Sequence, residues 1–135
     1  MIIKTRKQVE LEAKLCACSD ICDTTQYFEK LQNLGRELKS NEAFLNLSNF
    51  GLALSSVERI IILDALKERD RCVCELEAIL DKSQSTISHH LRKLERANLI
   101  KSYKKGNYNY YGLKKDQFAS NLEVLNKMFT LVIST

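Results

Sequence analysis

The chain has 135 residues, of which 44% are apolar and 28% are charged, with four Gly and no Pro. This length suits one compact domain with an added arm, and the composition argues against wholesale disorder. No stretch approaches the roughly 20 apolar residues that a membrane-spanning helix needs. The N-terminus becomes charged after three residues, which argues against a secretory signal. We therefore expect a soluble, cytoplasmic, mainly helical protein.

The net charge of +4 conceals an uneven distribution. Residues 82–115 contain nine Lys or Arg and one acid, which gives +8, whereas the rest of the chain sums to −4. A basic segment of this kind is either a solvated lysine face or a nucleic-acid-binding surface. The charge alone does not decide between the two, so the local pattern must.

Helical spacing dominates the first half of the chain. Apolar residues recur every three or four positions over 27–38, and residues 44–52 predict a second helix or a continuation of the first. Ser55 to Glu58 has the pattern of a capping box, which predicts that another helix begins there and continues through Leu66.

The second half predicts two helices, a hairpin and a final helix. A short helix over 74–80 is followed by a turn at 81–83 and by a longer helix over about 84–97. Strands at 100–103 and 108–113 enclose a bend that contains Gly106. The last helix has one broad apolar stripe, made of Phe118, Leu122, Leu125, Met128, Phe129 and Val132.

This order is that of a helix-turn-helix followed by a β-hairpin wing. Three segments carry a family resemblance: Cys-Val-Cys-Glu-Leu at 72–76, Ser-Gln-Ser-Thr-Ile-Ser-His-His-Leu-Arg-Lys-Leu at 83–94, and Tyr-Asn-Tyr-Tyr-Gly-Leu at 108–113. Together they make residues 43–115 resemble the ArsR/SmtB family of winged-helix, metal-responsive repressors. One departure lies near Ser55, where the family usually has Asp-Pro-x-Arg and Ser56 takes the place of the Pro.

The resemblance implies a mainly α (α+β) winged helix-turn-helix with a β-hairpin wing, an N-terminal helical extension and a C-terminal dimerisation helix. It divides the chain into a cysteine-containing arm and helix over 1–40, a DNA-binding domain over 41–115 and a dimerisation helix over 116–135. The family forms homodimers, and dimeric readers bind two half-sites of double-stranded operator DNA.

The helix from Gln84 has one apolar face and one polar face. Ile87, Leu91 and Leu94 follow core spacing, so the opposite side is expected to face the major groove of DNA. Arginines there can reach a phosphate or a guanine edge, and lysines in the wing suit phosphate contacts. The expected DNA contacts are Ser83, Gln84, Ser85, Ser88, His89, Arg92, Arg96, Lys104 and Lys105.

For the adjacent histidines and the wing tyrosines, packing is favoured over metal binding and base stacking. His90 flanks the core stripe and is expected to be packed and hydrogen-bonded. His89 and His90 diverge by 100° on the helix, which disfavours a shared metal ion. The three tyrosines over 108–111 invite an interpretation as base-stacking residues, but aromatics in a short hairpin usually pack across the strands.

Five cysteines fall in two clusters, at 16–22 and 72–74, a distribution that argues against a structural disulfide framework. Cys72 and Cys74 stand at a predicted helix start, where the helix dipole is expected to lower the thiol pKa. Cys18 and Cys22 share a helical face if that stretch is helical. These four could form a four-sulfur site for a soft or borderline ion, and Cys16 is either a replacement for Cys18 or a bystander.

The resemblance assigns this thiol set more closely. Cys-x-Cys at this helix start resembles the inducer site of the family's thiolate sensors, and the added Cys-x-x-x-Cys is similar to the cadmium/lead-responsive repressors of the CadC type. It implies a thiophilic inducer (Cd, Pb or Zn, with trivalent As as an alternative) at Cys18, Cys22, Cys72 and Cys74. In those relatives the N-terminal pair comes from the other protomer. The family's second site needs acidic or His ligands on the last helix, which offers Asp116 and no His.

The expected function is therefore a repressor that leaves its operator when a soft metal ion binds cysteine thiolates. An arsenic or antimony sensor and a thiol-redox regulator are the alternatives, followed by a metal-buffering protein that never binds DNA. Enzymatic activity is not expected, because Cys-x-x-Cys, nucleophile-elbow and phosphate-loop motifs are all missing.

Overall fold

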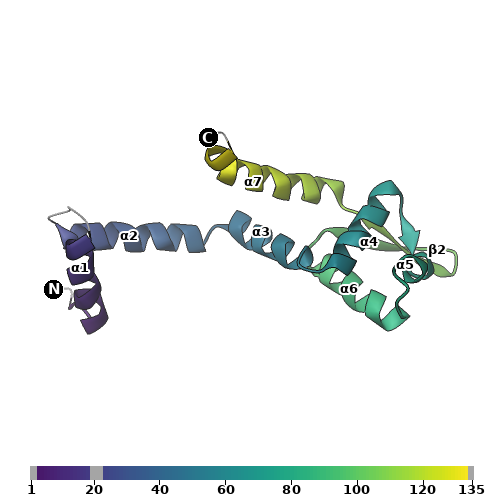
Figure 1. The fold of residues 1–135 in the computed structure, drawn as a ribbon, viewed down its shortest axis with the longest axis horizontal. Helices are drawn as coiled ribbons and strands as arrows, with labels where there is room; N and C mark the ends of the chain where they lie inside the picture. Colours follow the sequence, from purple (N-terminus) through teal and green to yellow (C-terminus); the bar gives the residue numbers. More distant parts are fainter. Residues whose placement is uncertain (1–2, 19–22, 134–135) are drawn as a thin grey trace. The chain divides into compact units, whose positions relative to one another are not determined.

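A computed structural model describes residues 3–18 and 23–133, without the side chains of residue 18 and of 131–133 (Figure 1). The chain divides into two compact units, residues 1–41 and 42–135. No helix in the described part of the chain is long and apolar enough to cross a membrane.

The first unit is a pair of helices, α1 (Arg6–Cys18) and α2 (Thr24–Lys39). The carboxylate of Asp23 caps α2 by accepting from the backbone N–H of Gln26 at 3.1 Å. Phe28 of α2 is buried. The ammonium of Lys4 contacts the carboxylate of Glu12 at 2.9 Å, and Glu12 is itself buried. Helix α1 had no counterpart among the elements expected from the sequence.

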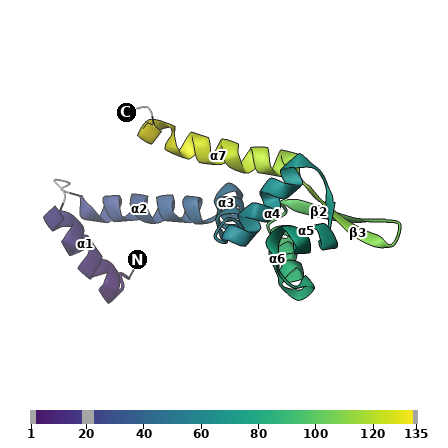
Figure 2. The same cartoon turned by 45° about the vertical axis from the view of Figure 1, so that its right-hand side comes forward.

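The second unit contains the expected helix-turn-helix and wing. Its two strands β2 and β3 form a hairpin that projects beyond the helices (Figure 2). A two-residue strand, β1, pairs with β3 and gives an antiparallel sheet of order β1-β3-β2. The elements in chain order are α3 (Glu42–Ala53), α4 (Val57–Glu68), β1 (Arg71–Cys72), α5 (Val73–Leu80), α6 (Gln84–Arg96), β2 (Ile100–Lys105), β3 (Tyr108–Leu113) and α7 (Lys115–Ile133).

One hydrophobic core holds the helix-turn-helix together. Ile62 of α4, Leu76 of α5 and Ile87 of α6 have no exposed surface, and they pack in one cluster with residues from α3 and β2. Phe50 of α3 meets Phe118 of α7 edge to face, with ring centroids 5.3 Å apart. The core therefore fixes α6 on the domain body and leaves its opposite face outside.

The start of α4 differs from the expected capping box. Ser56, not Ser55, caps the helix by accepting from the N–H of Arg59 at 3.4 Å. Val57 is then the first helical residue, which is the position that Pro favours at a helix start. Glu58 does not cap the helix, and its carboxylate contacts His90 of α6 instead.

Candidate nucleic-acid interface and thiol site

Helix α6 has one buried side and one exposed side, as the periodicity of its apolar residues predicts. Ile87, Leu91 and Leu94 are buried, with at most 1% of their surface exposed. The predicted DNA-contacting residues of this helix lie on the opposite side, where all are exposed except the half-buried Ser88. They are Gln84, Ser85, Ser88, His89, Arg92 and Arg96, with Lys93 beside them.

Ser83 has a structural task at the start of this helix. Its hydroxyl oxygen accepts from the N–H of Thr86 at 3.3 Å and lies 3.1 Å from the hydroxyl of Ser85. The serine is therefore the N-cap of α6, while its exposed side chain stays at the surface that the sequence assigns to DNA.

The outer face of α6 carries positive side chains that form no ion pair with a carboxylate in the described part of the chain. Among the described residues, none places a carboxylate oxygen within 4.0 Å of Arg92, Lys93 or Arg96. The charge of Lys93, followed by partial burial and by neighbouring cations, lowers the pKa of His89 below its ordinary value. The shift favours the neutral imidazole, which can donate one hydrogen bond and accept another.

His90 is packed and hydrogen-bonded, as expected. Its Nδ1 lies 3.2 Å from Nη1 of Arg59, and its Nε2 lies 2.5 Å from Oε2 of Glu58. Because a guanidinium only donates, Nδ1 accepts and the proton resides on Nε2, which donates to the carboxylate. This hydrogen bond lowers the pKa of Glu58. The network attaches the recognition helix to α4.

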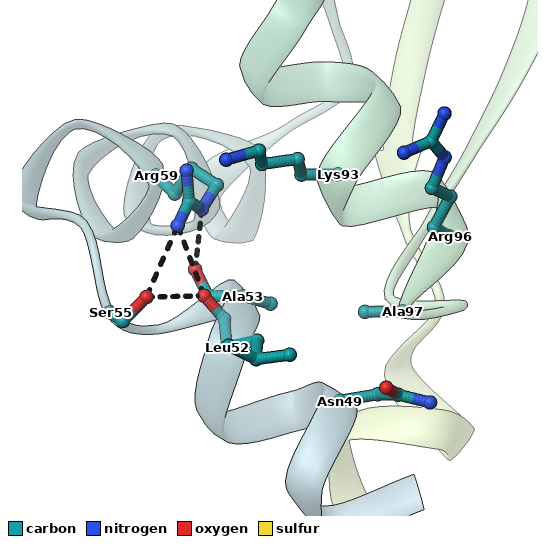
Figure 3. Close-up of a pocket in the computed structure, with 8 residues that line it drawn as sticks. All are labelled: Asn49, Leu52, Ala53, Ser55, Arg59, Lys93, Arg96 and Ala97. Carbon is teal, nitrogen blue, oxygen red and sulfur yellow. Dashed lines mark hydrogen bonds between the residues drawn. The ribbon is translucent and has the colours of Figure 1, made fainter.

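Arg59 extends the same network to the end of α3 (Figure 3). It is 6% exposed, and its Nε donates to the carbonyl of Ala53 at 2.9 Å. Its Nη2 donates to the carbonyl of Leu52 at 3.0 Å and to the hydroxyl of Ser55 at 3.3 Å. A cation here satisfies carbonyls at a helix C-terminus. The sequence analysis missed this role, because it becomes visible only when α3 and α4 are placed side by side.

The wing is a tight hairpin whose residues at the turn are Gly106 and Asn107. Gly106 has φ +64°, a left-handed conformation that glycine adopts without strain. Lys104 and Lys105 are the last residues of β2 rather than part of the turn, and both are exposed. They remain next to the tip, where the ammonium of Lys105 lies 5.6 Å from the ring centre of Tyr110.

Of the three tyrosines over 108–111, Tyr110 packs across the strands as expected, Tyr111 packs against the core, and Tyr108 is exposed. Tyr103 and Tyr110 face each other in register, with ring centroids 6.0 Å apart and planes at 21°. The hydroxyl of Tyr103 donates to the carboxylate of Asp70 at 2.6 Å. These contacts occupy the rings and tie the wing to the residue before β1.

Cys72 and Cys74 lie in one small pocket with parts of α6 and of the wing, the two elements that the sequence predicts to contact DNA. The pocket has a volume of about 260 Å³, and its walls include Gln84, the first residue of α6, and residues 107–109 of the wing. Strand pairing explains this placement, because Cys72 is in register with Tyr110 of β3. Cys72 is buried and Cys74 is exposed.

The expected lowering of the thiol pKa is wrong for Cys72. Burial, followed by hydrogen bonding with the Cys74 side chain, raises the pKa of the Cys72 thiol. Cys72 is the N-cap of α5, and its N–H donates to the carboxylate of Glu75 at 3.2 Å. The loss of hydration outweighs the favourable end of an eight-residue helix.

The other thiols of the expected site lie at the edge of the described chain. Cys18 is the last residue of α1, but its side chain lies outside the described part of the chain. The whole of Cys22 also lies outside it. Cys16 is exposed on α1. Among the residues whose side chains are described, no group of three or more His, Cys, Asp or Glu is arranged to hold a metal ion.

The apolar stripe of α7 is largely exposed. Leu122, Leu125, Met128 and Phe129 keep between 37% and 52% of their surface open, whereas Phe118 packs on α3. Val132, the last member of the expected stripe, has no described side chain.

Similarity to known proteins agrees with this geometry. Residues 56–102 match the family described as bacterial regulatory protein, arsR family. The chain is 33% identical to the cadmium resistance transcriptional regulatory protein CadC of Listeria innocua over 82% of this chain and 88% of that protein. It is 31% identical to the transcriptional repressor SmtB homolog of a Synechocystis strain, over 76% and 77% of the two chains.

Among solved structures, the homodimeric winged helix-turn-helix DNA-binding domain from Mycobacterium bovis shares the fold. Its TM-score is 0.54, with 23% identity over 65% of this chain and 83% of that one. The extent of the match to the cadmium-resistance regulator goes beyond a shared fold, and it includes the helix-turn-helix and wing derived above. The relatives are transcriptional regulators, which confirms that this is not an enzyme. The chain belongs to the ArsR family of bacterial regulatory proteins.

Proposed function

We propose that this ArsR-family regulator is a homodimeric repressor that binds operator DNA and leaves it when a soft metal ion binds Cys18, Cys22, Cys72 and Cys74. The observation that carries the proposal is the shared pocket of the Cys72–Cys74 pair. That pocket is walled by Gln84 at the start of the recognition helix and by residues 107–109 of the wing. A change at the thiols is therefore adjacent to two DNA-reading elements of the same chain.

The donor chemistry fits a thiophilic ion. Two thiols in one pocket offer soft ligands, which select Cd, Pb, Zn or trivalent As over hard ions such as Mg²⁺. When bound, such an ion would keep the thiols deprotonated and link them to further sulfur ligands. We assign the remaining ligands to the arm over 1–40, through Cys18 and Cys22. The relatives include a cadmium resistance regulator and an SmtB homolog, which supports this inducer class.

For DNA, we propose that the exposed face of α6 enters the major groove and that the wing lysines contact the backbone. The proposed contacts are Ser83, Gln84, Ser85, Ser88, His89, Arg92, Arg96, Lys104 and Lys105. The support is the exposure of this face and the absence, among the described residues, of ion pairs to Arg92 and Arg96, since positive side chains without an ion-pair partner attract phosphate. The α7 stripe, in the segment 116–135, is proposed to pair two such domains.

The DNA assignment is tested by changing two arginines. The Arg92→Ala, Arg96→Ala double variant should bind operator DNA at least tenfold more weakly, because it loses two exposed cations that have no structural partner. Its unfolding temperature should match that of the wild type. Unchanged affinity in fluorescence anisotropy would refute the assignment of α6.

The inducer assignment is tested by titrating fully reduced protein with Cd(II). A near-ultraviolet thiolate-to-metal absorption band should saturate near one equivalent per protomer and accompany release of labelled DNA. Cys74→Ser should weaken the band and the release together, while Cys16→Ser serves as the matched control on an exposed thiol.

Two other results would favour a different kind of regulator, and a third would refute metal sensing. Retention of full response in Cys18→Ser or Cys22→Ser would favour three-coordinate arsenic or antimony sensing. Release by oxidant alone, reversed by reductant, would favour a redox regulator. The absence of a band and of release would refute metal sensing altogether.

A further inference from the structure

A second cavity, of about 300 Å³, lies where the end of α3, α4 and the second half of α6 meet (Figure 3). Three cationic side chains line it: Arg59, Lys93 and Arg96. Asn49 and Ser55 add polar groups, and no carboxylate belongs to its lining. Of these residues only Arg96 belongs to the proposed DNA-contacting set, so the role of the cavity itself is not yet assigned.

The charges around the cavity are poorly compensated. The hydrogen-bond partners of buried Arg59 are two backbone carbonyls, a hydroxyl and an imidazole, all of them neutral. Lys93 extends from α6 toward the guanidinium of Arg59 (Figure 3). In the described part of the chain, neither Lys93 nor Arg96 has an ion-pair partner. Like charges that converge on a partly dehydrated hollow repel each other, so an anion between them is strongly favoured.

The position of the cavity indicates where the anion comes from. His89, Lys93 and Arg96 follow spacings of four and three, so the cavity continues the stripe that faces DNA. Ammonium and guanidinium groups are the usual ligands of phosphate oxygens in protein–DNA complexes. The same groups would also bind free inorganic phosphate, because the chemistry recognised is that of the phosphate group.

We propose that this cavity is a phosphate-binding site, occupied in the repressor–operator complex by one backbone phosphate. Lys93 and Arg96 supply the mobile ligands, and Arg59, held by the α3 carbonyls, supplies a fixed positive charge. The inference rests on the proposed DNA-reading face but not on metal sensing. The site would anchor the second half of α6 while the first half reads the bases.

The first experiment measures operator affinity between 50 and 200 mM salt for two variants that preserve the fold. Lys93→Gln removes one ligand, and Asn49→Asp places a carboxylate among the cations without removing any of them. Losing one phosphate contact reduces the slope of log K against log salt by about 0.9. Over this fourfold salt range the variant should lose about 3.5-fold less affinity than the wild type does. Asn126→Asp, an exposed position on α7, is the control of equal charge and should keep the wild-type slope.

The second experiment titrates DNA-free protein with inorganic phosphate at constant ionic strength, with chloride as the reference, and follows amide NMR signals of 93–97. Shifts that saturate, and that Asn49→Asp abolishes, show a phosphate site. If the salt slope also falls in both variants, the source is the DNA backbone. If only the titration responds, the source is a free phosphate solute. No response in either experiment, with thermal unfolding unchanged, would overturn the proposal.

Discussion

Replacing Arg59 with Met should strongly destabilise the regulator, because the guanidinium is buried and each of its nitrogens makes a hydrogen bond. Methionine keeps the length and the apolar stem of the side chain but removes all of its hydrogen bonds. The change leaves the carbonyl of Ala53 without its donor, and this contact is buried. It also removes the donor to Nδ1 of His90, which fixes the tautomer that binds Glu58.

The expected cost follows from these contacts one by one. A buried acceptor without a partner costs about 1–3 kcal/mol. The Leu52 carbonyl lies nearer to water and costs less, and the loss at His90 adds about 1 kcal/mol. The variant recovers part of this, because it no longer buries a charge. The net loss should be about 3 kcal/mol, which lowers the unfolding temperature of a chain of this size by roughly 10 °C.

Urea and thermal unfolding at one fixed protein concentration measure this cost, because the proposed dimerisation would make stability concentration-dependent. Arg92→Met is the matched control, with the same substitution on the exposed face of α6, and should unfold like the wild type. Arg59→Lys keeps the charge but has a single donor atom, so it should recover less than half of the loss. If Arg59→Met unfolds within about 0.5 kcal/mol of Arg92→Met, the assigned role of the guanidinium is wrong.

Further variants test three other parts of the structure. The pKa of Glu58 is lowered from 4.5, so its ionised form stabilises the fold fully above about pH 4.5 and this stabilisation is lost as the pH falls through the lowered pKa. Glu58→Gln should therefore flatten the loss of stability between pH 5 and 3, measured as urea midpoints, and parallel curves would contradict this. A Cβ at Gly112 would lie 2.5 Å from the Asp70 carboxylate, so Gly112→Ala should break the bond that Tyr103 donates and cost about 1 kcal/mol. Tyr103→Phe should cost a similar amount, and the double variant should cost less than the sum; full additivity would show separate causes. Met128→Asp on the α7 stripe should shift sedimentation toward monomer at micromolar concentration, whereas an unchanged dimer would place the interface elsewhere.

The recognition helix could be predicted from sequence because its pattern is local. The spacing of Ile87, Leu91 and Leu94 defines a buried side, and the opposite side follows from helix geometry. The wing followed from alternating residues around Gly106. For the same reason His90 could be placed at the edge of the core, although its partners Glu58 and Arg59 could not be named.

Features that depend on distant contacts were not predictable. Strand β1 has two residues and exists only because β3 lies beside it. The raised pKa of Cys72 follows from burial, which no local motif reveals. Helix α1 was missed because apolar residues are scattered among its charged ones without a clear stripe, and Lys4 and Glu12 gain their contacts only when the helix forms. The cavity at Arg59 needed three helices to be assembled first.

The contrast between buried Cys72 and exposed Cys74 also makes the protein a convenient starting point for a fluorescent reporter. In a Cys16→Ser, Cys18→Ser, Cys22→Ser background, a maleimide dye should react first with Cys74, because its thiol is open to water. The attached dye would lie beside Gln84 and the wing turn. Its emission would then change when DNA approaches these elements, which would give a direct optical signal of operator occupancy in a cell extract, without radioactive or labelled DNA.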